Sequence, residues 1–328
     1  MIYTDSVAKF ARKLKDGACA PLLLSDRKAG VSFLKNKLWF TYAVLLFCVT
    51  AWGSNFVFGA ILVEVFDPGI IALLRLVFIL LFLFFVTFRA VKSQKLSVRD
   101  YVFLAIAGFV GVTLNQWSFY ASLQFTEPVT AALILALSPI VTSLLSSYWF
   151  NERKTLRFWL GSLVALFGVW LVIANGSLLV PRIGKGELLI LLTMVSFSMF
   201  LIFVQHLSKS IHPAVITWYS NVFGAIGLIP FIPWETASRI WTVTAPYWLL
   251  LIATAVIMHG LCTYLWNNSI RQVGASKAAL LLNLEPFIAM VFSLMILGEG
   301  IQTLQLIGAT VIVCGVAFSL RTNHREPE

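Results

Sequence analysis

The chain contains a second copy of one of its own segments. Residues 122–169 align without a gap with residues 269–316, and thirteen of the 48 paired positions are identical. The identical pairs include residues that mark helix kinks, helix ends and close packing: Pro139 with Pro286, Glu152 with Glu299, Gly161 with Gly308, and Gly168 with Gly315. A duplicated membrane segment is typical of transporters built from internal repeats, whose substrate site lies where the copies meet. The duplication therefore predicts two related halves packed against each other.

The composition excludes an ordinary soluble domain. Hydrophobic residues make up 59% of the 328 residues, and the mean hydropathy is +0.90, whereas soluble domains have about 45–50% apolar residues. We therefore predict an all-α polytopic protein in the lipid bilayer. The net charge of +10 comes from basic residues in short connections between apolar runs, so we expect no nucleic-acid partner. The four cysteines have neither disulfide nor metal-ligand spacing and are expected to be small buried side chains.

Ten apolar runs approach the length of about 20 residues that a transmembrane helix needs. They are residues 38–62, 69–89, 101–121, 129–149, 157–175, 187–206, 213–233, 247–268, 276–297 and 301–320. Ten spans place both termini on the same side of the membrane.

The distribution of Lys and Arg predicts the orientation. With both termini cytoplasmic, that side collects twenty of these residues and the opposite side three, as the positive-inside rule requires. Each half has five spans, an odd number, so the second repeat is expected to lie inverted relative to the first. The predicted segments are a basic cytoplasmic tail (1–37), a first five-helix repeat (38–175), a second one (176–320) and a cytoplasmic C-terminal tail (321–328).

The N-terminal tail allows more than one interpretation. Val7, Phe10, Ala11 and Leu14 share one face of a hypothetical helix, opposite a basic face. Such a helix suits the surface of an anionic inner leaflet. A disordered basic tail and a misassigned start codon are the alternatives.

Two ionisable residues lie inside the predicted spans. Arg75 is about two turns in from the outer boundary of its span, and Glu285 is near the membrane midplane. A charge at this depth is costly and is a functional candidate by default. For Arg75, binding or gating competes with snorkelling to the membrane surface. For Glu285, a substrate-amine partner or proton acceptor competes with a structural ion pair or a buried neutral acid.

The two matched prolines are expected to kink their helices near the midplane. Pro139 and Pro286 each lack an amide donor, which frees the carbonyl groups of Leu135 and Leu282. In lipid, such a carbonyl has to face protein or a wet cavity. Kinks at matching points of two repeats are typical beside a central site. A packing kink without ligand contact is the alternative.

Polar and aromatic residues at helical spacing extend the candidate site. They are Trp52 and Asn55, Gln116 and Tyr120, Ser138, Trp218 and Asn221, and His259, Thr263 and Asn267. We predict that these side chains line a substrate path between the halves. Each stripe alone is equally compatible with interhelical hydrogen bonding, and His259 with a satisfied core histidine.

Other repeated residues are predicted to be structural. Glu152 and Glu299 end apolar runs and are expected to cap the following helix in a tight hairpin. The glycine pairs with seven-residue spacing are expected to allow close helix packing.

The sequence lacks the motifs of common membrane enzymes and of ATP-driven pumps. There is no HExxH, Gly-x-Ser-x-Gly or P-loop, and no Asp within a span. We therefore predict no enzyme activity, no cofactor and no metal, and transport that is secondary or passive.

Several of these residues resemble the drug/metabolite transporter superfamily, in particular its EamA-type ten-helix branch. The similarity covers about residues 38–320 and rests on Trp52-Gly53-Ser54-Asn55-Phe56, Arg75, Asn115-Gln116, Ser138-Pro139, Asn151-Glu152, Leu284-Glu285-Pro286 and Leu297-Gly298-Glu299. The resemblance implies a five-plus-five inverted repeat, a central cavity and export of amino acids or related metabolites across a bacterial inner (plasma) membrane. Asn151 departs from the glycine that the family often has before the glutamate.

The resulting hypothesis is a secondary exporter of a small metabolite, an amino acid or a related amine-bearing compound, working by alternating access. An intramembrane enzyme and a non-transporting receptor or assembly subunit are the alternatives. Proton coupling and oligomeric state stay open.

Overall fold

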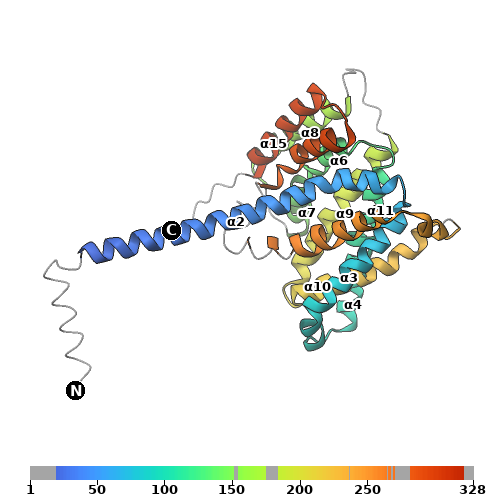
Figure 1. Cartoon of the computed structure of the whole chain (residues 1–328), viewed down its shortest axis with the longest axis horizontal. Helices are drawn as coiled ribbons and strands as arrows, with labels where there is room; N and C mark the ends of the chain where they lie inside the picture. Colours follow the sequence, from blue (N-terminus) through green and yellow to red (C-terminus); the bar gives the residue numbers. More distant parts are fainter. Residues whose placement is uncertain are drawn as a thin grey trace.

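The computed structural model describes residues 20–150, 154–174, 184–235, 237–263, 265–266, 269 and 281–320. Within these ranges every regular element is helical, so the predicted all-α class is confirmed (Figure 1). The first half forms α2 (Ala20–Val63), α3 (Pro68–Ser93), α4 (Val98–Gly108), η1 (Phe109–Leu114), α5 (Asn115–Ser122), α6 (Pro128–Leu135), α7 (Ser138–Phe150) and α8 (Leu156–Ala174). The second half forms α9 (Lys185–Leu207), α10 (Pro213–Leu228), η2 (Ile229–Phe231), η3 (Ala237–Thr242), α11 (Ala245–Ala253), η4 (Thr254–Leu261), α14 (Glu285–Phe292), η5 (Ser293–Leu297) and α15 (Thr303–Leu320).

The apolar helices have the lengths of membrane spans. In the described ranges, six are long and apolar enough to cross a membrane: Trp39–Val63, Pro68–Phe85, Val98–Ser122, Pro128–Trp149, Lys185–Leu207 and Pro213–Phe231. Four shorter apolar helices follow the same pattern: Leu156–Val172, Ala245–Leu261, Glu285–Leu297 and Thr303–Ser319. Each predicted span overlaps one of these helices. A polytopic membrane protein is therefore confirmed, and crossing by all ten helices stays a prediction.

Large apolar side chains cover much of the outer surface. Phe85 is 83% exposed, Tyr148 87% and Trp39 77%. Exposed apolar patches of this kind are uncommon on soluble monomers, and they suit helices that face lipid. Cys48 and Cys262 are buried free thiols as expected, but Cys314 is exposed, so the expectation of a buried side chain was wrong there.

Helix α2 is longer than the predicted first span. It runs for 44 residues from Ala20, with no break at residue 38, and its N-terminal part projects beyond the bundle (Figure 1). At 1.5 Å per residue it is about 66 Å long, roughly twice the hydrocarbon thickness. The proposed amphipathic stretch around residues 7–14 and the C-terminal tail 321–328 lie outside the described residues.

The start of α3 is fixed by local capping. The Asp67 carboxylate accepts a hydrogen bond from the Gly69 amide at 2.9 Å, and Pro68 occupies the first turn. Both features favour a helix start, because a carboxylate satisfies a free amide and proline does not need one. This capped start sets the position of Arg75, two turns further along the helix.

Helix breaks precede both repeated prolines. Helix α6 ends at Leu135 and α7 begins at Ser138; in the second copy, a turn at Asn283 and Leu284 precedes α14. The Leu135 carbonyl, which lacks its usual amide partner, accepts a hydrogen bond from the Ser138 hydroxyl at 2.5 Å. The first kink therefore satisfies its own backbone without a water-filled cavity.

The repeated glycines meet where α8 crosses α15. A Cβ atom at Gly161 would lie 2.6 Å from the Gly315 carbonyl oxygen, and one at Gly168 would lie 2.9 Å from the Gly308 carbonyl oxygen. The reciprocal distances, from Gly315 to the Gly161 oxygen and from Gly308 to the Gly168 oxygen, are 2.7 and 2.9 Å. The predicted role of these glycines in close packing is confirmed.

Candidate functional site

Arg75 is the centre of a buried polar cluster. Its side chain has no exposed surface, and its NH2 group lies 2.8 Å from Nδ1 of His259. Because a guanidinium group has only donors, Nδ1 of His259 must be the acceptor. His259 is therefore neutral in this contact and carries its proton on Nε2. The bond connects α3 of the first half with η4 of the second.

Two further side chains complete this cluster. The guanidinium carbon of Arg75 lies 5.5 Å from the centre of the Tyr120 ring, within cation–π range. Tyr120 is 1% exposed, and Asn55 of α2, 8% exposed, is close enough to interact with the Tyr120 phenol. We call Arg75, His259, Tyr120 and Asn55 the Arg75 cluster.

The Arg75 cluster has polar atoms without partners. Nε and NH1 of Arg75 and Oδ1 of Asn55 are buried and make no hydrogen bond. Buried polar groups are usually paired, because leaving one unpaired costs about 1–3 kcal/mol or more. The Arg75 cluster can therefore accept a polar group whose acceptors match the free N–H groups. Among the described residues, no three His, Cys, Asp or Glu side chains gather to hold a metal ion.

Trp52 holds the segment that carries His259. Its indole Nε1 donates a hydrogen bond to the Met258 carbonyl at 2.7 Å, and its ring lies 5.0 Å from that of Trp266. Met258 directly precedes His259 in η4, where the π-helical geometry frees carbonyl groups from the regular pattern. Trp52 thus fixes α2 against η4 beside the Arg75 cluster.

Glu285 lies on another side of α2. It is the first residue of α14, it is half-buried, and its carbonyl oxygen would lie 2.9 Å from a Cβ atom at Gly53. Gly53 and Asn55 are two residues apart on α2 and point in directions that differ by about 200°. In the part of the chain that the structure describes, no ion pair joins Glu285 to Arg75.

The other predicted residues lie outside the Arg75 cluster. Ser138 bonds to its own helix turn, Asn221 donates to the Thr217 carbonyl one turn earlier at 2.7 Å, and the Trp218 ring lies 6.2 Å from that of Phe84. Gln116 is half-buried and Thr263 is exposed, and no hydrogen bond among the described residues links either to the cluster. Asn267 lies outside the described residues. The predicted stripes therefore converge only in part.

The predicted cap of Glu299 differs in the structure. Its carboxylate accepts a hydrogen bond from the hydroxyl of Ser293, the first residue of η5, six residues earlier in the chain. At the start of α15, the Gln302 amide instead donates to the Gln305 side chain at 3.1 Å. Glu299 closes the preceding helix rather than opening the following one, because Gly298, at φ 71°, ends η5 and turns the chain back. Glu152 lies outside the described residues.

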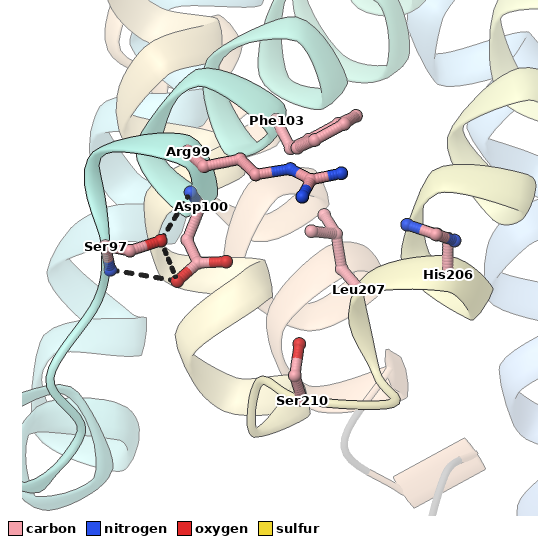
Figure 2. Close-up of a pocket in the computed structure, with 7 residues that line it drawn as sticks. All are labelled: Ser97, Arg99, Asp100, Phe103, His206, Leu207 and Ser210. Atoms are coloured by element: carbon pink, nitrogen blue, oxygen red, sulfur yellow. Dashed lines mark hydrogen bonds between the residues drawn. The ribbon is translucent and has the colours of Figure 1, made fainter.

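A separate pocket of about 390 Å³ lies where α4 begins and α9 ends. Figure 2 shows the Arg99 guanidinium pointing between Phe103 and His206. The Asp100 carboxylate accepts hydrogen bonds from the amide and hydroxyl groups of Ser97, at 2.9 and 2.7 Å, and so caps α4 (Figure 2). None of the predicted site residues lines this pocket, which sits at the basic end of the helices.

A polar contact between α5 and α9 was not predicted from the sequence. Asn115 donates to the Thr193 carbonyl at 3.1 Å, and the hydroxyl groups of Ser118 and Thr193 are 2.7 Å apart. Asn115 belongs to a motif noted in the sequence, but Thr193 lies in an apolar run with no repeat partner to mark it. These bonds hold the helix of Tyr120 against the second half.

Comparisons with known proteins agree with this architecture. The sequence pattern of the EamA-like transporter family matches residues 39–174 and again residues 184–321. The uncharacterized transporter YyaM of Bacillus subtilis (strain 168) is 29% identical over 282 residues, which cover 84% of this chain and 92% of the relative. YetK of the same organism, also an uncharacterized transporter, is 24% identical over 92% of both chains.

The similarity extends to archaea and to a solved structure. An uncharacterized transporter of Archaeoglobus fulgidus is 24% identical over 85% of this chain and 98% of its own. A crystal structure matches with a TM-score of 0.62 and 16% identity over 85% of this chain and 96% of the other, which shows a shared fold. The match of the family pattern to both halves means that this chain belongs to the EamA-like transporter family of the drug/metabolite transporter superfamily.

Proposed function

We propose that the protein is a secondary transporter that exports a small amine-bearing metabolite by alternating access between two inverted five-helix halves. The observation that carries the proposal is the Arg75 cluster, in which α3 of one half bonds to η4 of the other in the buried interior. Polar residues inside a membrane bundle mark substrate or ion pathways. A site between the halves is exposed to either side when the halves rock against each other.

The glycine contacts support an inverted arrangement of residues 38–175 and 176–320. Gly161 corresponds to Gly308 in the repeat, and Gly168 to Gly315, whereas the contacts join Gly161 to Gly315 and Gly168 to Gly308. Exchanging the two copies converts one contact into the other, as a two-fold axis does. The glycine that comes later in α8 contacts the glycine that comes earlier in α15, so the two helices are antiparallel. A two-fold axis that exchanges antiparallel helices is perpendicular to both of them. Because both helices are proposed to cross the membrane, this axis lies in the membrane plane.

Other matched features follow the same symmetry. The π-helical segment η4 includes residues 256–261, which are the repeat counterparts of η1. Segment η1 packs on α10, and η4 packs on α3. Helix α14 packs on α2, and its counterpart α7 packs on α9. Each element thus contacts the opposite half in an equivalent way.

The bacterial inner membrane with cytoplasmic termini is the proposed location. The excess of basic residues at one end of the helices supports the orientation. Several relatives come from bacteria, where a transporter of this kind resides in the plasma membrane. We propose no partner other than a small-molecule substrate and the bilayer.

Glu285 is the proposed substrate-amine partner or proton acceptor. Its repeat counterpart Ser138 donates a hydrogen bond to the carbonyl that the proline frees. A carboxylate has only acceptors, so Glu285 can make the equivalent bond to the Leu282 carbonyl only when it is protonated. Proton binding and the state of the second kink are then coupled at one residue.

The test is a metabolite screen with proteoliposomes. Liposomes with the wild-type protein should take up amine-bearing metabolites above empty liposomes, and Glu285→Gln, which keeps the size of the side chain, should lose this uptake or its pH dependence. If Glu285→Gln transports fully and keeps the pH dependence, Glu285 has neither proposed role. If the wild type moves nothing from a broad panel, the protein is a receptor or assembly subunit and the transport proposal fails.

A further inference from the structure

The Arg75 cluster contains a positive charge without a negative partner. Arg75 has no exposed surface, and none of the described acids lies within ion-pair distance of its guanidinium group. Its contacts are a neutral imidazole and the face of a phenol ring. An uncompensated buried charge is unfavourable, and proteins normally pair it with an opposite charge.

The free donors of Arg75 define what would compensate it. A guanidinium group has five N–H donors. The NH2 group donates one hydrogen bond to His259. The Nε and NH1 groups together have three N–H donors, and these donors have no partner. Carboxylate oxygens match the planar fork of arginine better than any neutral acceptor does.

We propose that Arg75 binds the carboxylate group of the transported substrate. The inference rests on the proposed transport function and specifies its substrate class as monocarboxylates.

A single carboxylate fits the charge of the site better than a phosphate monoester. Among the described members of the Arg75 cluster, Arg75 is the one formal charge, and His259 is held neutral because its Nδ1 accepts the bond. A carboxylate with one negative charge is neutralised by one guanidinium group, whereas a phosphate monoester carries about −1.5 to −2 near pH 7. The second phosphate charge would stay buried without a partner.

His259 marks the side from which the carboxylate arrives. Arg75 and Tyr120 are closed off, while His259 is partly exposed. In the proposed alternating access, a shift of η4 against α3 would separate Arg75 from His259 and expose the guanidinium group. The His259 bond thus holds the arginine side chain in place until the substrate carboxylate takes over.

A purely structural role of Arg75 predicts different behaviour. If Arg75 were only a bridge between α3 and η4, replacing it would weaken the folded protein whether or not a ligand is present. If Arg75 binds the substrate, its uncompensated charge lowers the stability of the ligand-free protein. Arg75→Gln removes this charge, and the ligand-free variant is then at least as stable as the ligand-free wild type. The two roles therefore differ in the unfolding temperature without ligand.

The experiment uses matched ligands with the purified full-length chain. Each set contains an amino acid, its amide, its decarboxylated amine and the matching carboxylic acid without the amine, for alanine, leucine and phenylalanine. Binding is measured by isothermal titration calorimetry, and the unfolding temperature is measured with and without each ligand. Variants are Arg75→Gln, Arg75→Lys and Arg99→Gln.

Arg99→Gln is a matched control. Arg99 also lies over an aromatic ring, with its guanidinium carbon 5.6 Å from the centre of the Phe103 ring, but it is exposed and outside the cluster. The same chemical change there should leave ligand binding unaltered.

The proposal expects binding that depends on the carboxylate. In at least one set the amino acid binds wild type and Arg99→Gln equally, and its amide and amine bind about ten- to hundredfold more weakly, as expected for one charge-assisted interaction. Arg75→Gln binds the amino acid about ten- to hundredfold more weakly than wild type does, and it binds the amino acid and its amide equally. Arg75→Lys has an affinity for the amino acid between those of wild type and Arg75→Gln.

Three results would overturn it. They are equal binding of amines and acids, retention of carboxylate selectivity in Arg75→Gln, and absence of binding by every acid. In the first two cases, an uptake assay with the same compounds in proteoliposomes separates the two proposals. If the compounds are taken up, the protein is still a transporter and only the proposed role of Arg75 is wrong. If no compound is taken up, the proposed transport function is wrong as well.

Discussion

The crossing of α8 and α15 gives a stability prediction that can be worked from distances. A Cβ atom at Gly315 would lie 2.5 Å from the Ala165 amide nitrogen and 2.7 Å from the Gly161 carbonyl oxygen. Both are backbone atoms, so neither can rotate away. Ordinary contacts begin at 3.4 Å, and Gly315→Ala therefore requires the helices to separate by about 0.9 Å at this point (3.4 minus 2.5).

The cost follows from the lost contacts. A gap of 0.5–1 Å forfeits roughly a quarter to a half of the dispersion energy across it, and one atom pair contributes about 0.1–0.2 kcal/mol. If the crossing has roughly the 40–60 contacts of a buried leucine, the loss is on the order of 1–6 kcal/mol. Measured costs of overpacking are about 1–3 kcal/mol. We therefore expect Gly315→Ala to lower the free energy of unfolding by about 1–3 kcal/mol.

Gly59→Ala is the matched control in another helix interior. A Cβ atom there would meet the end of the Leu123 side chain at 2.7 Å, which can move aside. Reversible denaturation of purified protein, followed by circular dichroism, compares the two variants. The packing argument is refuted if Gly315→Ala is as stable as Gly59→Ala. Gly161→Ala should have a similar effect to Gly315→Ala, and the double variant less than the sum, because both side chains force the same separation.

Two further predictions concern single hydrogen bonds. Ser138→Ala leaves the Leu135 carbonyl without a donor in the membrane interior and should cost about 1–3 kcal/mol in the same denaturation assay, with unchanged stability as the contradicting result. Trp52→Phe keeps a ring against Trp266 but removes the indole donor to the Met258 carbonyl, so it should destabilise by about 0.5–3 kcal/mol. A Trp52→Phe variant as stable as wild type would mean that this bond does not hold η4 in place.

The repeat made much of the architecture predictable. Gly161, Gly168, Gly308 and Gly315 could be assigned to close packing because they recur at the same spacing in two apolar runs. The helix break before Pro139 was predictable for a similar reason, since proline cannot donate and the consequence is local. Apolar content sufficed for the membrane class. Features that depend on backbone chemistry or on strongly apolar runs are visible in one sequence.

Side-chain pairing was not predictable in the same way. Arg75 and His259 are 184 residues apart, and nothing in either local sequence indicates that they meet. The stripe containing His259 also predicted roles for Thr263 and Asn267, but π-helical turns in η4 change the side-chain direction that a regular helix would give. Thr263 accordingly points outward while His259 contacts Arg75.

Glu299 illustrates a different limit. Its position between two helices allowed a cap for either one, and the repeat could not distinguish them. The choice depends on Gly298, whose positive φ turns the chain back so that the carboxylate reaches Ser293. The length of α2 was not predictable either. Residues 20–38 extend the helix beyond the predicted span, and hydropathy does not indicate where a helix continues outside its apolar run.

The inverted arrangement of the two copies in the membrane can be tested by labelling two equivalent positions. Thr155 and Gln302 correspond in the repeat, and both are exposed. Thr155 directly precedes α8, and Gln302 directly precedes α15. In a background without the native cysteines, Thr155→Cys and Gln302→Cys are expressed in intact cells and treated with a membrane-impermeant thiol reagent. Labelling of Gln302→Cys, with Thr155→Cys labelled only after the cells are opened, is the predicted result. Labelling of both from outside, or of neither, would contradict the inverted arrangement.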